Sequence, residues 1–251
     1  MKKAIILLHG FLSDQSDFDP IMPDLETRYD YIERFVYPGH HDDESYENFN
    51  DEETFFRLEK CFEQLLKKYP IVDVIGYSMG GALGVYLSQK YAFRKLVLLA
   101  PANKYFNIFL PYAKLKHYAR NFVSLEKAII QKNDQDKTGY RIILSHTLEE
   151  DKESLRFLYE RYLHSYFLTA FKNFRRLIKK ANRELKTINN PCFIAWGEVD
   201  QLVPKKTITF LAAKCTHPDS KWCIYQHVSH LMLKSAFHQQ LKSDVLIFLD
   251  A

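Results

Sequence analysis

The chain has 251 residues, of which 47% are hydrophobic and 26% charged, a balance typical of globular proteins rather than disordered or fibrous ones. This length suits one α/β domain, or a core domain with a sizeable insertion, and excludes two ordinary domains of full size. The net charge of +4 is too small to indicate a nucleic-acid-binding protein.

The N-terminal residues 1–12 imitate a signal peptide, because two lysines precede an apolar run. The run ends at His9 after about five residues, whereas a signal core has about 7–15, so we interpret it as a buried strand. No stretch approaches the roughly 20 apolar residues of a membrane span, and the four cysteines form neither a C-x-x-C pair nor a zinc spacing. We therefore expect a cytoplasmic protein with free thiols, no stable membrane insertion and no metal.

Apolar runs and helical patterns alternate through the first hundred residues. The apolar runs predict buried strands at 4–8, 31–37, 71–75 and 95–100. Apolar residues at helical spacing predict helices at 55–69 and 80–91. This alternation is typical of right-handed βαβ crossovers, and it predicts a parallel sheet.

The alternation breaks between residues 104 and 187. This segment shows aromatic-rich helical patterns, and residues 104–184 hold 17 Lys and Arg against 9 Asp and Glu. Afterwards the alternation resumes, with predicted strands and helices at 192–196, 207–214, 221–226 and 237–249. We therefore predict an α/β core formed by residues 1–103 and 188–251, interrupted by a helical insertion at 104–187.

The strongest chemical signal is the sequence Gly76-Tyr77-Ser78-Met79-Gly80, which matches the pattern G-x-S-x-G. It lies directly between a predicted strand and a predicted helix. A serine on such a sharp turn projects its Oγ above the sheet edge, and glycines on both sides avoid clashes with the neighbouring strand and helix. The helix N-terminus also favours the negative charge that develops during acyl transfer. We predict that this serine is a nucleophile.

The loop 9–11 ends the first predicted strand and therefore meets the same sheet edge as the nucleophile. The backbone N–H of Phe11 can pair with that of Met79 to form an oxyanion hole, and Leu12 is the alternative donor. We interpret His9 as a structural histidine that holds this loop by hydrogen bonding.

An acid and a base follow the serine along the chain. Asp200 and Glu198 both lie in the turn after the predicted strand 192–196, and we prefer Asp200 because it is further along the loop. His230 follows the last predicted strand, whereas its rival His227 lies at the strand end, where we interpret it as structural. The order serine, aspartate, histidine predicts a triad in which the histidine accepts the serine proton and the aspartate orients the histidine.

These residues resemble the α/β-hydrolase superfamily, particularly small bacterial carboxylesterases and monoacylglycerol-lipase-like enzymes. The motifs that carry the resemblance are His9-Gly10-Phe11, Pro38-Gly39-His40, Gly76 to Gly80, Gly197 to Asp200, and His230. Family members often carry Gly-His-Gly after the proline, whereas this chain has Gly39-His40-His41, a departure that affects a loop and not the triad. The resemblance implies a mostly parallel, doubly wound sheet of the α/β-hydrolase fold, with residues 104–187 as a helical cap.

The predicted triad indicates a carboxylesterase or lipase-like hydrolase in which Ser78 attacks an ester carbonyl and water later hydrolyses the acyl-enzyme. Neither a metal nor an organic cofactor is required. We expect a small-molecule ester with an apolar acyl group as the substrate, and no nucleic-acid partner. Substrate contacts are predicted at Leu12, Tyr77, Tyr105 and Tyr166. Aromatic residues of the cap can equally be buried in its own core.

Three other kinds of protein fit the same residues less well. Menaquinone-pathway C–C lyases of the superfamily carry a very similar Tyr-Ser-Met-Gly-Gly turn, but they usually place an arginine after the second glycine, where this chain has Ala82. A haloalkane dehalogenase would carry Asp at the position of Ser78. A non-catalytic binding protein would use the basic insertion to dock an acidic partner or a membrane surface, and an intact triad argues against that.

Overall fold

The computed structural model describes residues 1–41, 43–104, 107, 164–183 and 185–251. Its contacts divide the chain into a larger unit, Met1–Asn107 with Leu168–Ala251, and a smaller unit, Ile108–Phe167. Most of the predicted cap therefore lies outside the described residues, and its division from the core stays a prediction. In the described part, no helix is long and apolar enough to cross a membrane. The four cysteines are free thiols, as the sequence predicted.

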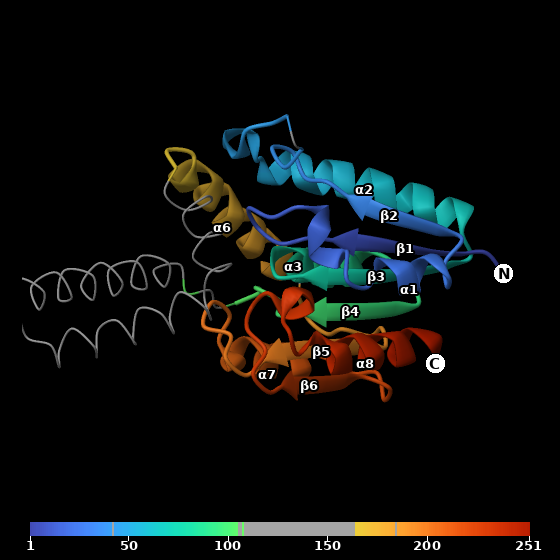
Figure 1. The fold of residues 1–251 in the computed structure, drawn as a ribbon. Coiled ribbons are helices and arrows are strands. Elements are labelled where there is room, and N and C mark those ends of the chain that lie inside the picture. The colour runs from blue at the N-terminus through green and yellow to red at the C-terminus, as the bar shows by residue number, and fades with distance from the viewer. Residues whose placement is uncertain (42, 105–106, 108–163, 184) are drawn as a thin grey trace, which may run out of the picture. The chain divides into compact units, whose positions relative to one another are not determined.

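Six parallel strands form one sheet in the order β2-β1-β3-β4-β5-β6, and their arrows all point to the same side in Figure 1. The strands are β1 Lys3–Leu8, β2 Tyr31–Phe35, β3 Ile71–Tyr77, β4 Lys95–Leu99, β5 Cys192–Gly197 and β6 Lys221–Tyr225. Because β1 lies between β2 and β3, the chain winds outward in both directions from this point. The six predicted strands and the parallel sheet are confirmed.

The four central strands are buried along almost their whole length, whereas the edge strands are partly exposed. Every residue of β4 and β5 is buried, but β6 exposes Trp222 and Ile224. A strand that is covered on both faces needs apolar side chains at successive positions. This is why the sequence shows the central strands as uninterrupted apolar runs.

Helices cover both faces of the sheet, as a doubly wound fold requires. They are α1 Met22–Glu26, α2 Asp51–Lys68, α3 Met79–Lys90, α6 Phe167–Arg183, α7 Lys205–Ala212 and α8 His238–Asp250. Three short 3-10 helices lie between them, η1 Gln15–Phe18, η2 Tyr46–Asn48 and η3 Met232–Lys234. Side chains from α1 and α8 join one hydrophobic cluster with β1, β3, β4 and β5. Helix α3 packs against β1, β3 and β4.

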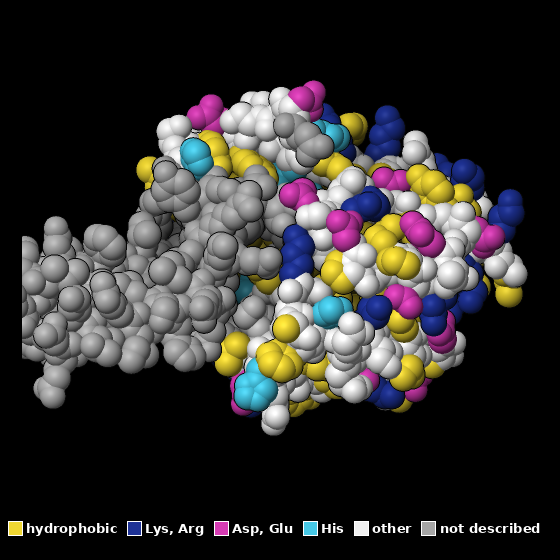
Figure 2. Space-filling view, in the orientation of Figure 1, with side chains coloured by type: hydrophobic (Ala, Val, Ile, Leu, Met, Phe, Trp, Pro, Cys, Tyr) yellow, Lys and Arg dark blue, Asp and Glu magenta, His cyan; other side chains and the backbone are white. Residues whose placement is uncertain are grey.

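The exposed face seen in Figure 2 carries basic and acidic side chains side by side over the described part of the larger unit. The sheet beneath it positions the loops that follow its strands. Since all six strands are parallel, the loops after β1, β3, β5 and β6 start from the same edge. Ligands of open α/β sheets bind at this edge, and the predicted triad residues lie in the loops that start from it.

Candidate active site

Ser78 forms the turn between β3 and α3 in a conformation that L-residues rarely adopt. Its φ is +52° and its ψ is −112°. Its N–H donates to the carbonyl of Leu99 at 2.9 Å, and its carbonyl accepts from the N–H groups of Gly81 and Ala102, both at 3.0 Å. Hydrogen bonds to the end of β4, to the residues that follow it, and to α3 thus hold the strained turn in place.

Two glycines of the G-x-S-x-G pattern lie where no side chain fits. A Cβ on Gly80 would lie 1.9 Å from the carbonyl oxygen of Leu8, and one on Gly76 would lie 2.3 Å from the carbonyl oxygen of Gly80. The N–H of Gly80 also donates to the carbonyl of His9 at 3.1 Å. Helix α3 therefore starts in direct backbone contact with the end of β1, and the glycines make this close approach possible.

The loops after β3, β5 and β6 bring Ser78, Asp200 and His230 into one hydrogen-bonded chain. Nε2 of His230 lies 3.1 Å from Oγ of Ser78, and Nδ1 lies 2.8 Å from Oδ2 of Asp200. The other oxygen of Asp200 accepts the N–H groups of Leu202 and Val203, both at 2.9 Å. With the proton on Nδ1, the imidazole donates to the carboxylate and presents a free lone pair to the serine hydroxyl.

The two rival residues, Glu198 and His227, take no part in these hydrogen bonds. Glu198 is exposed, and its N–H donates to the carbonyl of Tyr225 at 2.9 Å. His227 is exposed, has a φ of +59°, and packs its ring 5.6 Å from that of Phe237. The geometry therefore favours the residues that the sequence preferred over both rivals.

The loop after β1 carries the predicted oxyanion-hole donor Phe11. Leu12 follows with a φ of +53° and is fully buried, and Met79 is the first residue of α3. Gly10 N–H donates to a side chain of its own loop, but among the residues that the structure describes, the N–H groups of Phe11 and Met79 have no hydrogen-bond acceptor. Both groups are thus available to a ligand.

His9 is fully buried under this loop. Its Nδ1 lies 2.9 Å from the carbonyl of Gly10, and its ring centroid lies 4.2 Å from that of Tyr37. Burial lowers its pKa to about 4, so the ring is neutral at pH 7. These contacts agree with a structural histidine that holds the loop.

The structure describes Leu12, Tyr77 and Tyr166 among the four predicted substrate residues, and it brings Tyr77 into contact with the loop after β6. Leu12 is buried in the loop after β1, and Tyr77 donates its hydroxyl to the carbonyl of His230 at 3.0 Å. Tyr105 lies outside the described residues. Tyr166 belongs to the smaller unit, where its ring stacks on His164. Contact of these four residues with a substrate stays a prediction.

Sequence reasoning missed Asp17, a buried carboxylate next to the predicted oxyanion hole. Its Oδ2 accepts the N–H of Gly10 at 3.2 Å, and its Oδ1 accepts the hydroxyl of Ser13 at 2.8 Å. Nothing in the sequence distinguishes it from its neighbours Asp14 and Asp19. Elsewhere in the described part, no group of three or more His, Cys, Asp or Glu side chains could hold a metal ion.

Comparisons with known proteins agree with this fold. Residues 3–236 match the family model described as alpha/beta hydrolase fold. A Mycoplasma pneumoniae protein that carries an esterase/lipase name is 26% identical over 234 residues, covering 82% of this chain and 75% of that protein. A Mycoplasma genitalium protein with the same name is 32% identical over 105 residues, and the match covers 41% of this chain but only 39% of that protein.

Two solved structures share the whole fold at low identity. An esterase from Exiguobacterium antarcticum superposes with a TM-score of 0.66 at 15% identity, covering 99% of this chain and 92% of that one. The MenH structure from S. aureus gives a TM-score of 0.62 at 20% identity, covering 99% and 93%. At these identities the likeness concerns the fold alone.

Proposed function

Because the chain belongs to the alpha/beta hydrolase family, we propose that it is a serine hydrolase that cleaves carboxylic esters with Ser78, His230 and Asp200 as its triad. One observation carries the proposal. The serine, the histidine and the aspartate are linked by hydrogen-bonding distances of 3.1 and 2.8 Å, in the order that acyl transfer requires. The esterase/lipase names of two relatives support the same reaction class.

The proposed reaction begins when Oγ of Ser78 attacks the ester carbonyl carbon and its proton passes to Nε2 of His230. Asp200 stabilises the resulting imidazolium through Nδ1–H. The negative oxygen of the tetrahedral intermediate accepts the N–H groups of Phe11 and Met79, which is consistent with the absence of other acceptors for these groups among the described residues. The histidine then protonates the leaving alcohol, and water hydrolyses the acyl-enzyme by the same route.

We assign the substrate as a small ester with an apolar acyl group. Leu12, buried in the loop after β1, and Tyr77, which bonds to the carbonyl of His230, are the proposed contacts within the core. Tyr105 and Tyr166 are the proposed contacts from the cap at 104–187. Phe11 supports an apolar site, because its ring packs against Phe174 of α6 at 4.6 Å. No step of the reaction needs a metal or an organic cofactor.

Initial rates on p-nitrophenyl esters from acetyl to palmitoyl test the proposal. The Ser78→Ala variant is expected to lose about 10⁴- to 10⁶-fold in kcat on the preferred ester, because it removes the nucleophile. Ser88→Ala is the matched control, since this half-buried serine of α3 bonds to the carbonyl of Val85 and to Gln89, away from the proposed triad. A wild-type protein that hydrolyses none of these esters, or a Ser78→Ala variant with wild-type rates, contradicts the proposal.

A further inference from the structure

The proposed reaction depends on the relative position of two loops that start from distant strands. The first, which we call the oxyanion loop, follows β1 and carries the predicted oxyanion-hole donor Phe11. The second, which we call the histidine loop, follows β6 and carries His230. Three strands, β3, β4 and β5, separate β1 from β6 in the sheet. A small shift between such loops matters, since misplacing a reacting group by about 1 Å can cost about 100-fold in rate.

An ion pair joins these loops beside the triad. Oδ1 of Asp17, in η1, lies 3.4 Å from Nζ of Lys234, in η3, and the aspartate side chain is only 3% exposed. The lysine also donates to the hydroxyl of Ser16 at 3.0 Å. Tyr77 adds a second link, because its hydroxyl donates to the carbonyl of His230.

The carboxylate of Asp17 also holds the oxyanion loop by hydrogen bonds. It accepts the N–H of Gly10 and the hydroxyl of Ser13, the residues on either side of Phe11 and Leu12. Leu12 has a φ of +53°, a conformation that persists only where surrounding contacts enforce it. The aspartate bonds therefore bracket the strained segment that presents the predicted donor.

Gly10 shows how closely this loop is packed. A Cβ there would lie 3.1 Å from Cε1 of Tyr77 and 3.5 Å from Oδ2 of Asp17. The oxyanion loop is thus held between the ring of Tyr77, whose hydroxyl bonds to the histidine loop, and the carboxylate of Asp17, which pairs with Lys234. A movement of either partner passes directly to the backbone next to the predicted donor.

Stability alone does not account for a buried carboxylate at this place. Burial raises the pKa of the Asp17 carboxyl above its ordinary value, and Lys234 opposes this shift. Burying a carboxylate in an ion pair is often no more stabilising than an apolar replacement, so its presence is weak evidence of a stabilising role. Its position between the two loops favours a role in their alignment.

We propose that Asp17 is a positioning residue for the oxyanion hole, and that its ion pair with Lys234 sets the distance between the oxyanion loop and the histidine loop. The inference rests on the proposed ester hydrolysis. It predicts an effect on the transition state rather than on substrate binding, because an oxyanion forms only during the reaction.

Steady-state kinetics of Asp17→Asn and Lys234→Met, on the ester that wild type prefers, test the inference. Asp17→Asn is expected to lower kcat about 100-fold with KM unchanged, and to slow labelling of Ser78 by a fluorophosphonate to a similar extent. Lys234→Met is expected to change the same two quantities in the same direction by a smaller factor. The double variant is expected to be no slower than Asp17→Asn, since both changes break one interaction.

Two variants control for loss of charge and loss of an ion pair. Asp19→Asn removes a carboxylate from the same turn, where it pairs with Arg34 at the surface. Lys242→Met breaks the half-buried pair with Asp24, which links α8 to α1 rather than joining the two loops. Both controls are expected to keep wild-type kcat and KM.

The outcomes separate this inference from the proposed function. If wild type hydrolyses esters but Asp17→Asn keeps its kcat, or if KM rises while kcat stays constant, the positioning role is wrong. Equal losses of kcat in Lys242→Met and Lys234→Met also overturn it. If Asp17→Asn does not fold, Lys234→Met decides the question. The Lys234 side chain is 34% exposed, so its replacement should leave the protein folded. A wild type that neither hydrolyses esters nor labels at Ser78 refutes the proposed function instead, and this inference with it.

Discussion

The carboxyl and amino ends of the strands form two edges of the sheet that differ in backbone strain and in polar contacts. At the carboxyl edge, where the candidate site lies, the described part of the chain has four non-glycine residues with positive φ: Leu12, Ser78, Ala100 and His227. They follow β1, β3, β4 and β6, and no other non-glycine residue that the structure describes has a positive φ. Among the described residues, backbone strain is therefore confined to the edge where the proposed chemistry takes place, as is common for functional sites.

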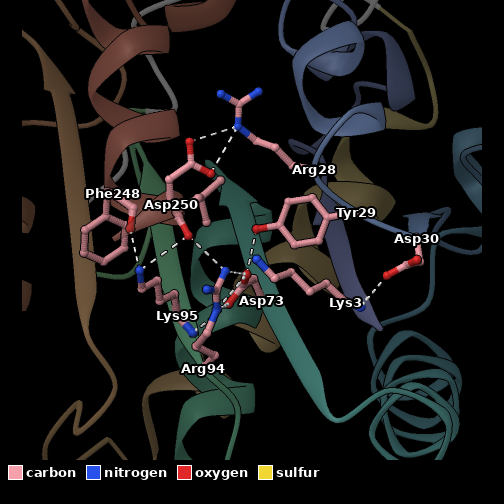
Figure 3. A network of polar contacts seen from close by, with 10 residues as sticks. Lys3, Arg28, Tyr29, Asp30, Asp73, Arg94, Lys95, Phe248 and Asp250 are labelled. Carbon is pink, nitrogen blue, oxygen red and sulfur yellow. Dashed lines mark hydrogen bonds and ion pairs between the residues drawn. The ribbon is translucent and has the colours of Figure 1, made fainter. Parts of the chain in front are cut away.

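At the amino edge, a network of satisfied polar groups surrounds Asp73 (Figure 3). This fully buried carboxylate accepts from Nε of Arg94 at 2.9 Å, from the N–H of Lys95 at 3.0 Å and from the hydroxyl of Tyr29 at 2.6 Å. Burial and the neighbouring carboxylate raise the pKa of the tyrosine, which keeps its hydroxyl a donor.

The same network ties the C-terminal helix to the sheet. Nη2 of Arg94 donates to the carbonyl of Leu249 at 2.9 Å, and Nζ of Lys95 donates to the carbonyl of Phe248 at 2.7 Å. These carbonyls belong to the last turn of α8, which has no partners for them within the helix. The carboxyl edge therefore holds the strained residues around the proposed chemistry, whereas the amino edge holds a hydrogen-bonded network that stabilises the fold.

The largest expected effect is on activity at the carboxyl edge. Asp200→Asn should lower kcat by about 10⁴-fold, because an amide NH₂ facing Nδ1 favours the wrong imidazole tautomer. Stability should change little, since the amide oxygen can still accept the N–H groups of Leu202 and Val203. Steady-state rates and urea unfolding measure both quantities. Glu198→Gln is the exposed control in the same turn, and equal losses in the two variants would contradict the assignment.

The matching change at the amino edge should affect stability only. Asp73→Asn should lower the free energy of unfolding by about 3 kcal/mol, because an amide NH₂ then faces the donors of Arg94 or Tyr29 inside the protein. The folded variant should keep the wild-type kcat. Asp250→Asn, which breaks a surface pair with Arg28, is the control and should cost less than about 1 kcal/mol. A large drop in kcat for Asp73→Asn would remove the contrast between the edges.

Acid should lower the stability of the protein through His9, which lies at the carboxyl edge. Its pKa is about 4 in the folded protein, against an ordinary value of 6.5 in the unfolded chain, so below pH 6.5 the unfolded chain binds a proton that the folded protein does not. Stability is therefore lost as the pH falls from 6.5 toward 4, by about 2 kcal/mol between pH 7 and pH 5 for this residue. Urea unfolding of wild type and His9→Asn at both pH values measures it. Identical pH dependence in the two proteins would refute this prediction.

The smallest expected effect concerns the strain at the nucleophile. Ser78→Gly should be more stable than Ser78→Ala by up to about 1 kcal/mol, because glycine adopts a φ of +52° without a steric cost while alanine keeps the strain. Both variants should be inactive on esters. Thermal unfolding of the two proteins side by side measures the difference, and a glycine variant that is clearly less stable would show that the turn is not strained.

Much of the fold could be predicted because burial leaves a mark on local sequence. The central strands are covered on both faces, so they read as apolar runs, and all six strands were predicted. Strand β2 was expected to reach residue 37 but ends at Phe35, since strand ends depend on the pairing with β1. The glycines around Ser78 could be interpreted for a similar reason, as a sharp turn between strand and helix requires them.

The sequence alone was enough to predict the succession of strands and helices, the turn that presents Ser78, and the chain order of Ser78, Asp200 and His230. These features follow from residues that are neighbours along the chain. The tertiary structure alone established the strand order, brought the preferred Asp200 to 2.8 Å from the histidine, and distinguished Asp17 and Asp73 from the many other acidic residues. The physical reason is that a carboxylate acquires its role from the donors that surround it, and here those donors come from distant parts of the chain.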